Sequence, residues 1–274
     1  MTATKFIDAN GVRFAYLESG SGPLVLLVHG FPDTAHTWDL VRPALAKSGF
    51  RAVAPFTRGY APTSVPTDGE YGSAMLGQDL LALVTALGES SAVIVGHDWG
   101  ASAAYAAAAI DPARVKKLIT VGIPHPGSVR LTPRVLWMVR HFFRFQFPDA
   151  EARVSRDDFA HVDELVRRWS PAWDVPRGET DAVKVAFREP GCLNAALGYY
   201  RALKRGIPRV HKTSISVDSV AFAGLDDNVE LDAYEHARKM FSGRYEVVQM
   251  RGGHFMHREH PDAFERELLR VITA

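Results

Sequence analysis

The chain of 274 residues contains a single cysteine, Cys192. One thiol excludes an internal disulfide and any metal site built from several cysteines, so we expect Cys192 to be a small buried side chain. No apolar run approaches the roughly 18 residues of a membrane span, and the residues after Met1 lack the charged and then apolar pattern of a signal peptide. The sequence therefore predicts a soluble, cytoplasmic protein.

An excess of charge of either sign is also absent, since 32 Lys and Arg residues face 31 Asp and Glu residues. This balance removes the bulk electrostatic attraction that binding to nucleic acid or to an anionic membrane uses. A small neutral substrate suits the chain better, and a homodimer is compatible with it. The length fits one α/β core that carries an insertion.

Strands and helices alternate at both ends of the chain. The turn Asn10-Gly11 between Lys5–Asp8 and Val12–Glu18 predicts an antiparallel hairpin. Apolar runs predict strands at Leu24–Val28, Ala52–Ala54, Ala92–Gly96, Leu118–Val121, Val217–Ala223 and Glu246–Met250, and helical spacing predicts helices at Trp38–Lys47, Met75–Leu87, Gly100–Ile110, Leu231–Phe241 and from Pro261. This order predicts an α/β fold whose mostly parallel, eight-stranded sheet has helices on both faces.

Buried-strand runs disappear between His125 and Thr213, where arginine, aromatic residues and helical spacing dominate. We expect residues 125–213 to form an inserted helical cap, with residues 1–124 and 214–274 forming the two parts of the core. The aromatic side chains of Trp137, Phe142, Phe143 and Trp169 either line a cavity or fill the core of the cap.

The segment Val95-Gly-His-Asp-Trp-Gly-Ala101 lies where a predicted strand ends and a helix begins. Gly96 and Gly100 flank Asp98 at the spacing of a nucleophile elbow, a strained turn that leaves no room for side chains at the flanking positions. The alternative is that Asp98 is only a helix N-cap. The elbow pattern by itself does not decide between them.

Three other segments follow predicted strands, at the sheet edge where α/β proteins place ligand sites. His29-Gly-Phe-Pro-Asp33 offers the Phe31 amide as an oxyanion donor beside that of Trp99, and we expect His29 itself to be structural. Gly224-Leu-Asp-Asp-Asn228 offers Asp227, or failing that Asp226, to orient a histidine, and Gly252-Gly-His-Phe-Met-His257 offers His254. The order nucleophile, acid, histidine is that of α/β-hydrolases. We expect His97, His257 and His260 to be packing or surface residues.

An aspartate nucleophile restricts the chemistry. Attack on an acyl carbon would give an unstable anhydride, whereas attack on a saturated carbon that bears a halide or an epoxide oxygen gives an alkyl ester. His254, oriented by Asp227, would then activate water to cleave the ester, and the Phe31 and Trp99 amides would stabilise the oxyanion. The cap must supply a donor for the leaving atom.

At this point the chain resembles the epoxide hydrolases of the α/β-hydrolase superfamily. The resemblance rests on His29-Gly-Phe-Pro, Arg58-Gly-Tyr60, Gly96-His-Asp-Trp-Gly100, Ile123-Pro-His-Pro126, Leu193-Asn-Ala-Ala-Leu-Gly-Tyr-Tyr-Arg-Ala202 and Gly253-His-Phe255. It implies an enzyme that needs no cofactor or metal and that opens an epoxide to a vicinal diol. It also implies that two cap residues, usually tyrosines, bind the epoxide oxygen. Tyr200 matches the second, and His141 fills the position of the first.

The chain departs from the family pattern in two further places, with Phe56 where an aspartate is usual and Ala61 where a glycine is usual. Fluoroacetate dehalogenases resemble it in the cap, but they hold the substrate carboxylate with arginines where this chain has Trp99 and Ser102. Haloalkane dehalogenases add a second halide-binding Trp or Asn, where this chain offers Phe31. A binding protein without catalysis is a third alternative.

Overall fold

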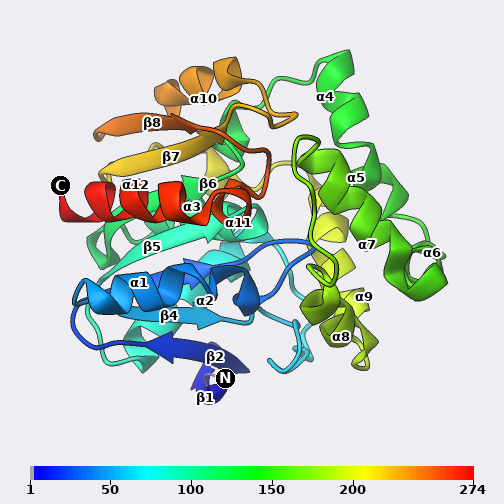
Figure 1. Cartoon of the computed structure of the whole chain (residues 1–274), viewed down its shortest axis with the longest axis horizontal. Helices are drawn as coiled ribbons and strands as arrows, with labels where there is room; N and C mark the ends of the chain where they lie inside the picture. Colours follow the sequence, from blue (N-terminus) through cyan, green and yellow to red (C-terminus); the bar gives the residue numbers. More distant parts are fainter. Residues whose placement is uncertain (1–2) are drawn as a thin grey trace.

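The computed structural model describes residues 3–274. Its centre is one eight-stranded sheet with the strand order β1-β2-β4-β3-β5-β6-β7-β8 (Figure 1). The strands are β1 (Lys5–Ala9), β2 (Val12–Ser19), β3 (Leu24–Val28), β4 (Arg51–Pro55), β5 (Ala92–His97), β6 (Val115–Val121), β7 (Ser219–Gly224) and β8 (Tyr245–Met250). β2 runs antiparallel to β1 and β4, and the other pairs are parallel. The predicted hairpin and parallel sheet are confirmed.

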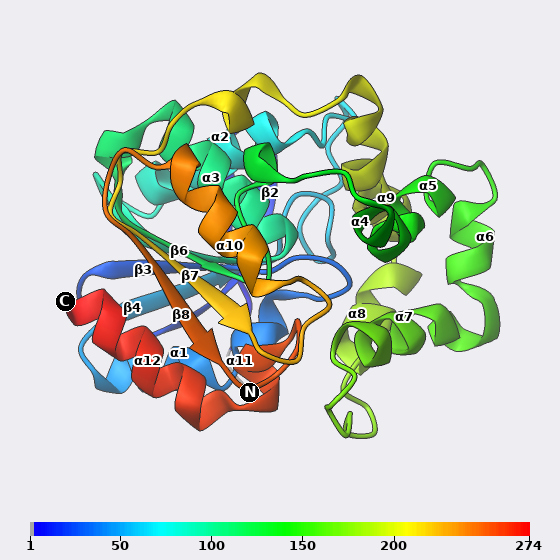
Figure 2. The same ribbon diagram turned by 90° about the horizontal axis from the view of Figure 1, so that it is seen from above.

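Helices cover both faces of the sheet, as Figure 2 shows from above. One face carries α2 (Ser73–Ala86), α3 (Trp99–Ile110) and α10 (Leu231–Ala237), and the other carries α1 (Val41–Lys47) and α12 (Pro261–Thr273). Because both faces are covered, every residue of β3 is buried, which explains its unbroken apolar sequence. The alanine-rich α3 lies close against α2, where a Cβ at Gly77 would fall 2.8 Å from that of Ala106.

The α-helices between β6 and β7 lie beyond one end of the strands (Figures 1 and 2). These helices are α4 (Pro133–Met138), α5 (Arg140–Arg144), α6 (Ala150–Val154), α7 (Arg156–Trp169), α8 (Asp181–Arg188) and α9 (Cys192–Ala202), and in α7 residues 157–159 have a left-handed backbone. We propose that residues 125–213 form the cap. Cys192 is buried, as predicted, and its Sγ accepts the Ala61 amide.

Several element boundaries differ from the sequence predictions. The predicted helix at Trp38–Lys47 is a 3-10 turn, Ala35–Trp38, followed by α1 from Val41, because Thr34 caps the earlier turn through its side chain. The predicted helix at Leu231–Phe241 stops at Ala237 and continues as a 3-10 turn over Arg238–Met240. Predicted strand residues Val217 and Asp218 precede β7, since Ser219 Oγ donates back to the Val217 carbonyl in a local turn.

One arginine, with a side chain that is 15% exposed, connects the cap with two core segments. Arg258 donates from Nη1 to Asp33 Oδ2 at 2.7 Å and from Nε to Glu179 Oε1 at 2.7 Å. Asp33 belongs to the loop after β3, Glu179 to the cap, and Arg258 to α11 (Met256–Glu259), next to the loop that carries His254.

Within residues 3–274, no helix combines the length and the hydrophobicity that a bilayer crossing requires.

Candidate active site

Asp98 occupies the sharp turn between β5 and α3. Its backbone has φ +51° and ψ −117°, a conformation that residues other than glycine seldom adopt. Although Asp98 stands at the N-cap position, its carboxylate makes no capping hydrogen bond to α3. Oδ1 instead accepts the backbone N–H of Phe31 at 2.9 Å. The helix-cap interpretation therefore does not explain where this carboxylate points.

The glycines around the turn confirm the predicted crowding. A Cβ at Gly96 would fall 2.3 Å from the Gly100 carbonyl oxygen, and a Cβ at Gly100 would fall 2.3 Å from that of Val28. Gly30, after β3, is equally confined, because its Cβ would fall 2.5 Å from Asp98 Oδ1 and 2.6 Å from the Trp99 amide nitrogen. The β3 loop and the elbow thus touch through backbone atoms around the Asp98 carboxylate.

His254 lies between two carboxylates. Its Nδ1 is 3.3 Å from Oδ2 of Asp227, and its Nε2 is 3.4 Å from Oδ2 of Asp98. Asp226 points elsewhere, since its Oδ2 accepts the Gly252 amide. Of the two aspartates that the sequence left open, Asp227 is the one in contact with His254.

The charges of this group stabilise one another. Burial on its own would lower the pKa of His254, but the hydrogen bond to Asp227 and the neighbouring Asp98 raise it to about 10. Burial would likewise raise the pKa of Asp98, but contact with His254 and the Phe31 amide bring it below its usual value. At neutral pH the site thus holds an imidazolium between two carboxylates.

Tyr200 on α9 and His141 on α5 are brought together by the cap, with ring centroids 5.6 Å apart. Tyr200 also packs edge-on against Trp99 at 5.1 Å and against Phe31 at 5.2 Å. Burial raises the pKa of Tyr200 well above its ordinary value. Burial, and then the charge of Arg168, lowers the pKa of His141 to about 3, so both side chains are uncharged at neutral pH.

A cavity of about 410 Å³ extends outward from Asp98 and Trp99. Phe142 lines it and packs against Tyr200 with ring centroids 4.9 Å apart, whereas Tyr200 and His141 are not themselves among its lining residues. Of the other aromatic candidates, Trp137 and Phe143 are more than half exposed. Residues that follow β5 and β6 line one part of the cavity, and residues of α4 and α5 line another.

Sequence reasoning missed two residues that hold His254. The Trp169 carbonyl, at the end of α7, accepts the His254 amide at 3.0 Å, and the Trp169 ring lies 5.3 Å from the imidazole. Nε2 of His97 lies 3.0 Å from the His254 carbonyl oxygen. Neither contact has a sequence signal, because Trp169 lies in the cap and backbone carbonyls leave no pattern. His97 and His257 are buried packing residues, as predicted.

The unusual Phe56 does not leave its loop unanchored. Nε2 of His29 accepts the Thr57 amide at 3.0 Å, so His29 has the predicted structural role. Arg58 forms a buried ion pair with Asp79, with Nε 2.7 Å from Oδ2. Phe56 itself is buried.

Comparison with known proteins identifies the family of the chain. The profile of the α/β-hydrolase fold family matches residues 23–261, and the chain belongs to that family. Within it, the chain belongs to the epoxide hydrolases: it is 31% identical to epoxide hydrolase A of Mycobacterium tuberculosis, over 98% of this chain and 97% of that one.

One further relative has a similar sequence identity, and one solved structure has the same fold. The AB hydrolase superfamily protein YfhM of Bacillus subtilis is 31% identical over 74% of this chain and 73% of its own length. The crystal structure of epoxide hydrolase A from Mycobacterium thermoresistibile superposes with a TM-score of 0.83, at 26% identity and 98% coverage of both chains.

Proposed function

We propose that this enzyme opens a small uncharged epoxide to a vicinal diol through a covalent alkyl ester on Asp98. The observation that carries the proposal is the Asp98 carboxylate itself, which contacts the Phe31 amide through one oxygen and His254 through the other. The names of the relatives support an epoxide as the electrophile.

Alkylation is the first step. The Phe31 amide holds Oδ1 of Asp98 at 2.9 Å, whereas the contact of Oδ2 with His254 is longer, at 3.4 Å, so Oδ2 is the less tightly held oxygen. Oδ2 attacks one ring carbon of the epoxide, a carbon–oxygen ester bond forms, and the bond from that carbon to the epoxide oxygen breaks. The bonding electron pair moves to the epoxide oxygen, which then needs a proton.

Tyr200 supplies this proton from its phenol, and His141 donates a hydrogen bond that holds the same oxygen. Both groups are uncharged because of burial, so each can be a donor. A neutral imidazole is a weaker acid than a phenol, which assigns proton transfer to Tyr200. Solvent returns a proton to Tyr200 during the cycle.

Hydrolysis is the second step, and the charge change at Asp98 prepares it. An ester carries no charge, so alkylation removes one of the two carboxylates that keep His254 protonated, and the pKa of His254 falls. The neutral imidazole, oriented by Asp227, takes a proton from water, and the hydroxide attacks the ester carbonyl carbon of Asp98. The amides of Phe31 and Trp99 stabilise the oxyanion, whose collapse breaks the ester bond and expels the alkoxide. The alkoxide takes the proton of the added hydroxyl group and leaves as the diol, which restores the Asp98 carboxylate.

Dehalogenation by the same nucleophile is the principal alternative. A haloacid would need cations for its carboxylate near Asp98, and Trp99 and Ser102 stand where fluoroacetate dehalogenases carry arginines. A haloalkane would need a second halide donor, and Phe31 offers only its backbone amide. These substitutions favour an epoxide. A binding protein without catalysis would not need a histidine shared between two carboxylates.

Trapping the intermediate tests the proposal. The His254→Gln variant retains Asp98 but lacks the base for hydrolysis, so incubation with a panel of terminal epoxides should add the full mass of the epoxide to Asp98. Peptide mass spectrometry after proteolysis locates the adduct, and Asp98→Asn with the same epoxides is the matched control. Fluoroacetate would add the mass of a carboxymethyl group if the protein is a dehalogenase. Absence of any adduct from both reagents would contradict the nucleophile role.

A further inference from the structure

A chain of polar side chains lies within the cavity, apart from the groups that carry the proposed reaction. Oγ of Ser73 lies 3.1 Å from Oγ of Ser102, which lies 3.2 Å from Nε2 of His211. All three residues line the cavity and each is at least 95% buried. Ser73 begins α2, Ser102 lies on α3, and His211 lies in the 3-10 turn Arg209–Lys212 after the cap helices.

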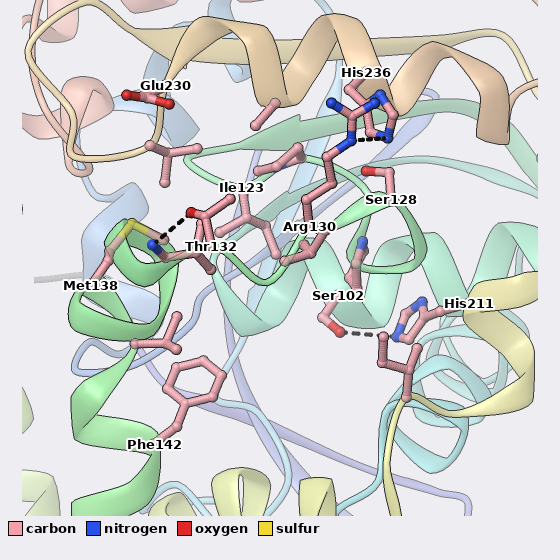
Figure 3. A pocket seen from close by; sticks show the side chains of 18 of the residues that line it. Ser102, Ile123, Ser128, Arg130, Thr132, Met138, Phe142, His211, Glu230 and His236 are labelled. Atoms are coloured by element: carbon pink, nitrogen blue, oxygen red, sulfur yellow. Dashed lines mark hydrogen bonds between the residues drawn. The ribbon is translucent and has the colours of Figure 1, made fainter.

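The surroundings of these three hydrogen-bonded side chains are mostly apolar. Figure 3 shows Ser102 and His211 across the cavity from Met138 and Phe142, and Ile123 adds a further apolar wall. Two polar pairs stand among the lining residues: Nε of Arg130 lies 3.0 Å from Nε2 of His236, and Nε of Arg134 lies 3.1 Å from Oε1 of Glu230. Ser73, Ser102 and His211 form a small, uncharged polar cluster among lining residues that are mostly apolar.

The position of Ser102 on α3 fixes how far it stands from Asp98, the proposed nucleophile. It follows Asp98 by one helical turn, and its amide donates to the Asp98 carbonyl at 3.1 Å. One turn advances about 6 Å along a helix, a length that about four bonds of an extended substituent span. A group four bonds from the epoxide ring can thus reach the serines while the ring carbon contacts Asp98.

The protonation state of His211 allows the hydrogen bonds that join His211, Ser102 and Ser73 to run in either direction. Burial lowers the pKa of His211 to about 4, so the ring is neutral at neutral pH and its proton can sit on either nitrogen. With the proton on Nε2, His211 donates to Ser102, Ser102 donates to Ser73, and the Ser73 hydroxyl has its own proton to give. With the proton on Nδ1, the order reverses and Ser73 keeps free electron pairs. Nδ1 is buried and has no hydrogen-bond partner within residues 3–274, so neither direction is fixed.

The pair Ser102 and His211 is not a second nucleophile of the serine-hydrolase type. Such a pair needs a carboxylate on Nδ1 to hold the tautomer and stabilise the imidazolium, and no carboxylate of residues 3–274 contacts Nδ1 of His211. A histidine with a pKa of about 4 is also a weak base toward a serine hydroxyl. Binding is the chemistry that remains.

We propose that Ser73, Ser102 and His211 form a specificity subsite for an uncharged oxygen group, a hydroxyl or a carbonyl, about four bonds from the epoxide ring. The inference rests on the proposed function and names its substrate class: epoxides with a polar, uncharged substituent. A carboxylate is excluded because the three residues carry no positive charge.

Two matched epoxides test the subsite. One is a terminal epoxide whose side chain ends in a hydroxyl about four bonds from the ring, and the other is its isostere with a methyl group in that place. We expect the wild type to have the higher kcat/KM for the hydroxyl compound. Ser102→Ala and Ser73→Ala should each lower the ratio of the two kcat/KM values by about 3- to 10-fold, the worth of one neutral hydrogen bond. Alanine suits position 102, since α3 is already alanine-rich.

Ser128→Ala is the matched control. It makes the same chemical change in the same cavity, but the Ser128 hydroxyl donates within its own turn to the His125 carbonyl at 2.7 Å. The kcat/KM ratio should therefore stay at the wild-type value. A ratio that is the same in wild type, Ser102→Ala and Ser73→Ala would overturn the subsite.

Binding of the two reaction products separates failure of the subsite from failure of the proposed function. The triol and the diol that correspond to the two epoxides are titrated against the Asp98→Asn protein, followed by tryptophan fluorescence, with and without Ser102→Ala. Tighter binding of the triol that Ser102→Ala abolishes would support the subsite even if no epoxide were turned over. Equal affinities for triol and diol would count against it whatever the protein catalyses.

Discussion

Nε2 of His254 lies 3.4 Å from Oδ2 of Asp98, so the proposed base and the proposed nucleophile are in charge contact before substrate arrives. This contact, together with the one to Asp227, raises the pKa of His254 to about 10 against the opposing effect of burial. In the proposed mechanism the same histidine must be neutral for hydrolysis, which links its charge to the state of Asp98.

Stability should depend on pH through this histidine. The pKa of His254 is higher in the folded protein than in the unfolded chain, where it is near 6.5, so its contribution is fully present below pH 6.5 and lost as the pH rises to about 10. Thermal unfolding of the free enzyme should therefore show a Tm that falls over this range. His254→Gln should remove this part of the fall, and an unchanged pH profile in that variant would contradict the assignment.

Asp227 and Asp226 should differ sharply although they are neighbours in sequence. Asp227→Asn removes the acceptor of the His254 hydrogen bond and favours the wrong tautomer, so we expect hydrolysis of the ester to slow by roughly three orders of magnitude. The alkyl enzyme should accumulate, which single-turnover kinetics with mass detection would show. Asp226→Asn, whose contact is to a backbone amide, should leave the rate within about tenfold of wild type. Equal losses would remove Asp227 from the triad.

Tyr200 and His141 should contribute unequally to the alkylation rate, because only Tyr200 protonates the epoxide oxygen in the proposed mechanism. Tyr200→Phe removes the proton donor, and we expect alkylation to slow by roughly 10²- to 10⁴-fold. His141→Phe removes one hydrogen bond and should cost less. Pre-steady-state rates of ester formation in the two variants provide the comparison, and a larger loss in His141→Phe would reverse the assigned roles.

Gly30 should be intolerant of a side chain. In Gly30→Ala the new Cβ would meet Asp98 Oδ1 and the Trp99 amide nitrogen, both within 2.6 Å, so the loop after β3 must shift. We expect a loss of about 1–3 kcal/mol in the free energy of unfolding, together with loss of activity from the displaced Phe31 amide. Gly72→Ala is the control, because a Cβ there meets nothing within 4 Å. Denaturant unfolding and turnover of an epoxide measure both effects.

The sequence determined the sheet and the elbow because their signals are local. Buried parallel strands require continuous apolar runs such as Leu24–Val28, and the crowding at Asp98 requires glycine two residues away on each side. Since the carboxyl ends of parallel strands share one edge, the loops with Phe31, Asp227 and His254 had to meet near Asp98. Strand and helix ends were less predictable, because side-chain caps such as that of Thr34 override apolar spacing.

Only the tertiary structure decided which aspartate contacts His254. Asp226 and Asp227 are chemically identical, and the turn after β7 directs one carboxylate to the imidazole and the other to the Gly252 amide. The fold also brought the Trp169 carbonyl to His254 and assembled Ser73, Ser102 and His211 from three separate segments. Such contacts join residues far apart in the chain through backbone atoms and single hydroxyls, which impose no spacing on the sequence.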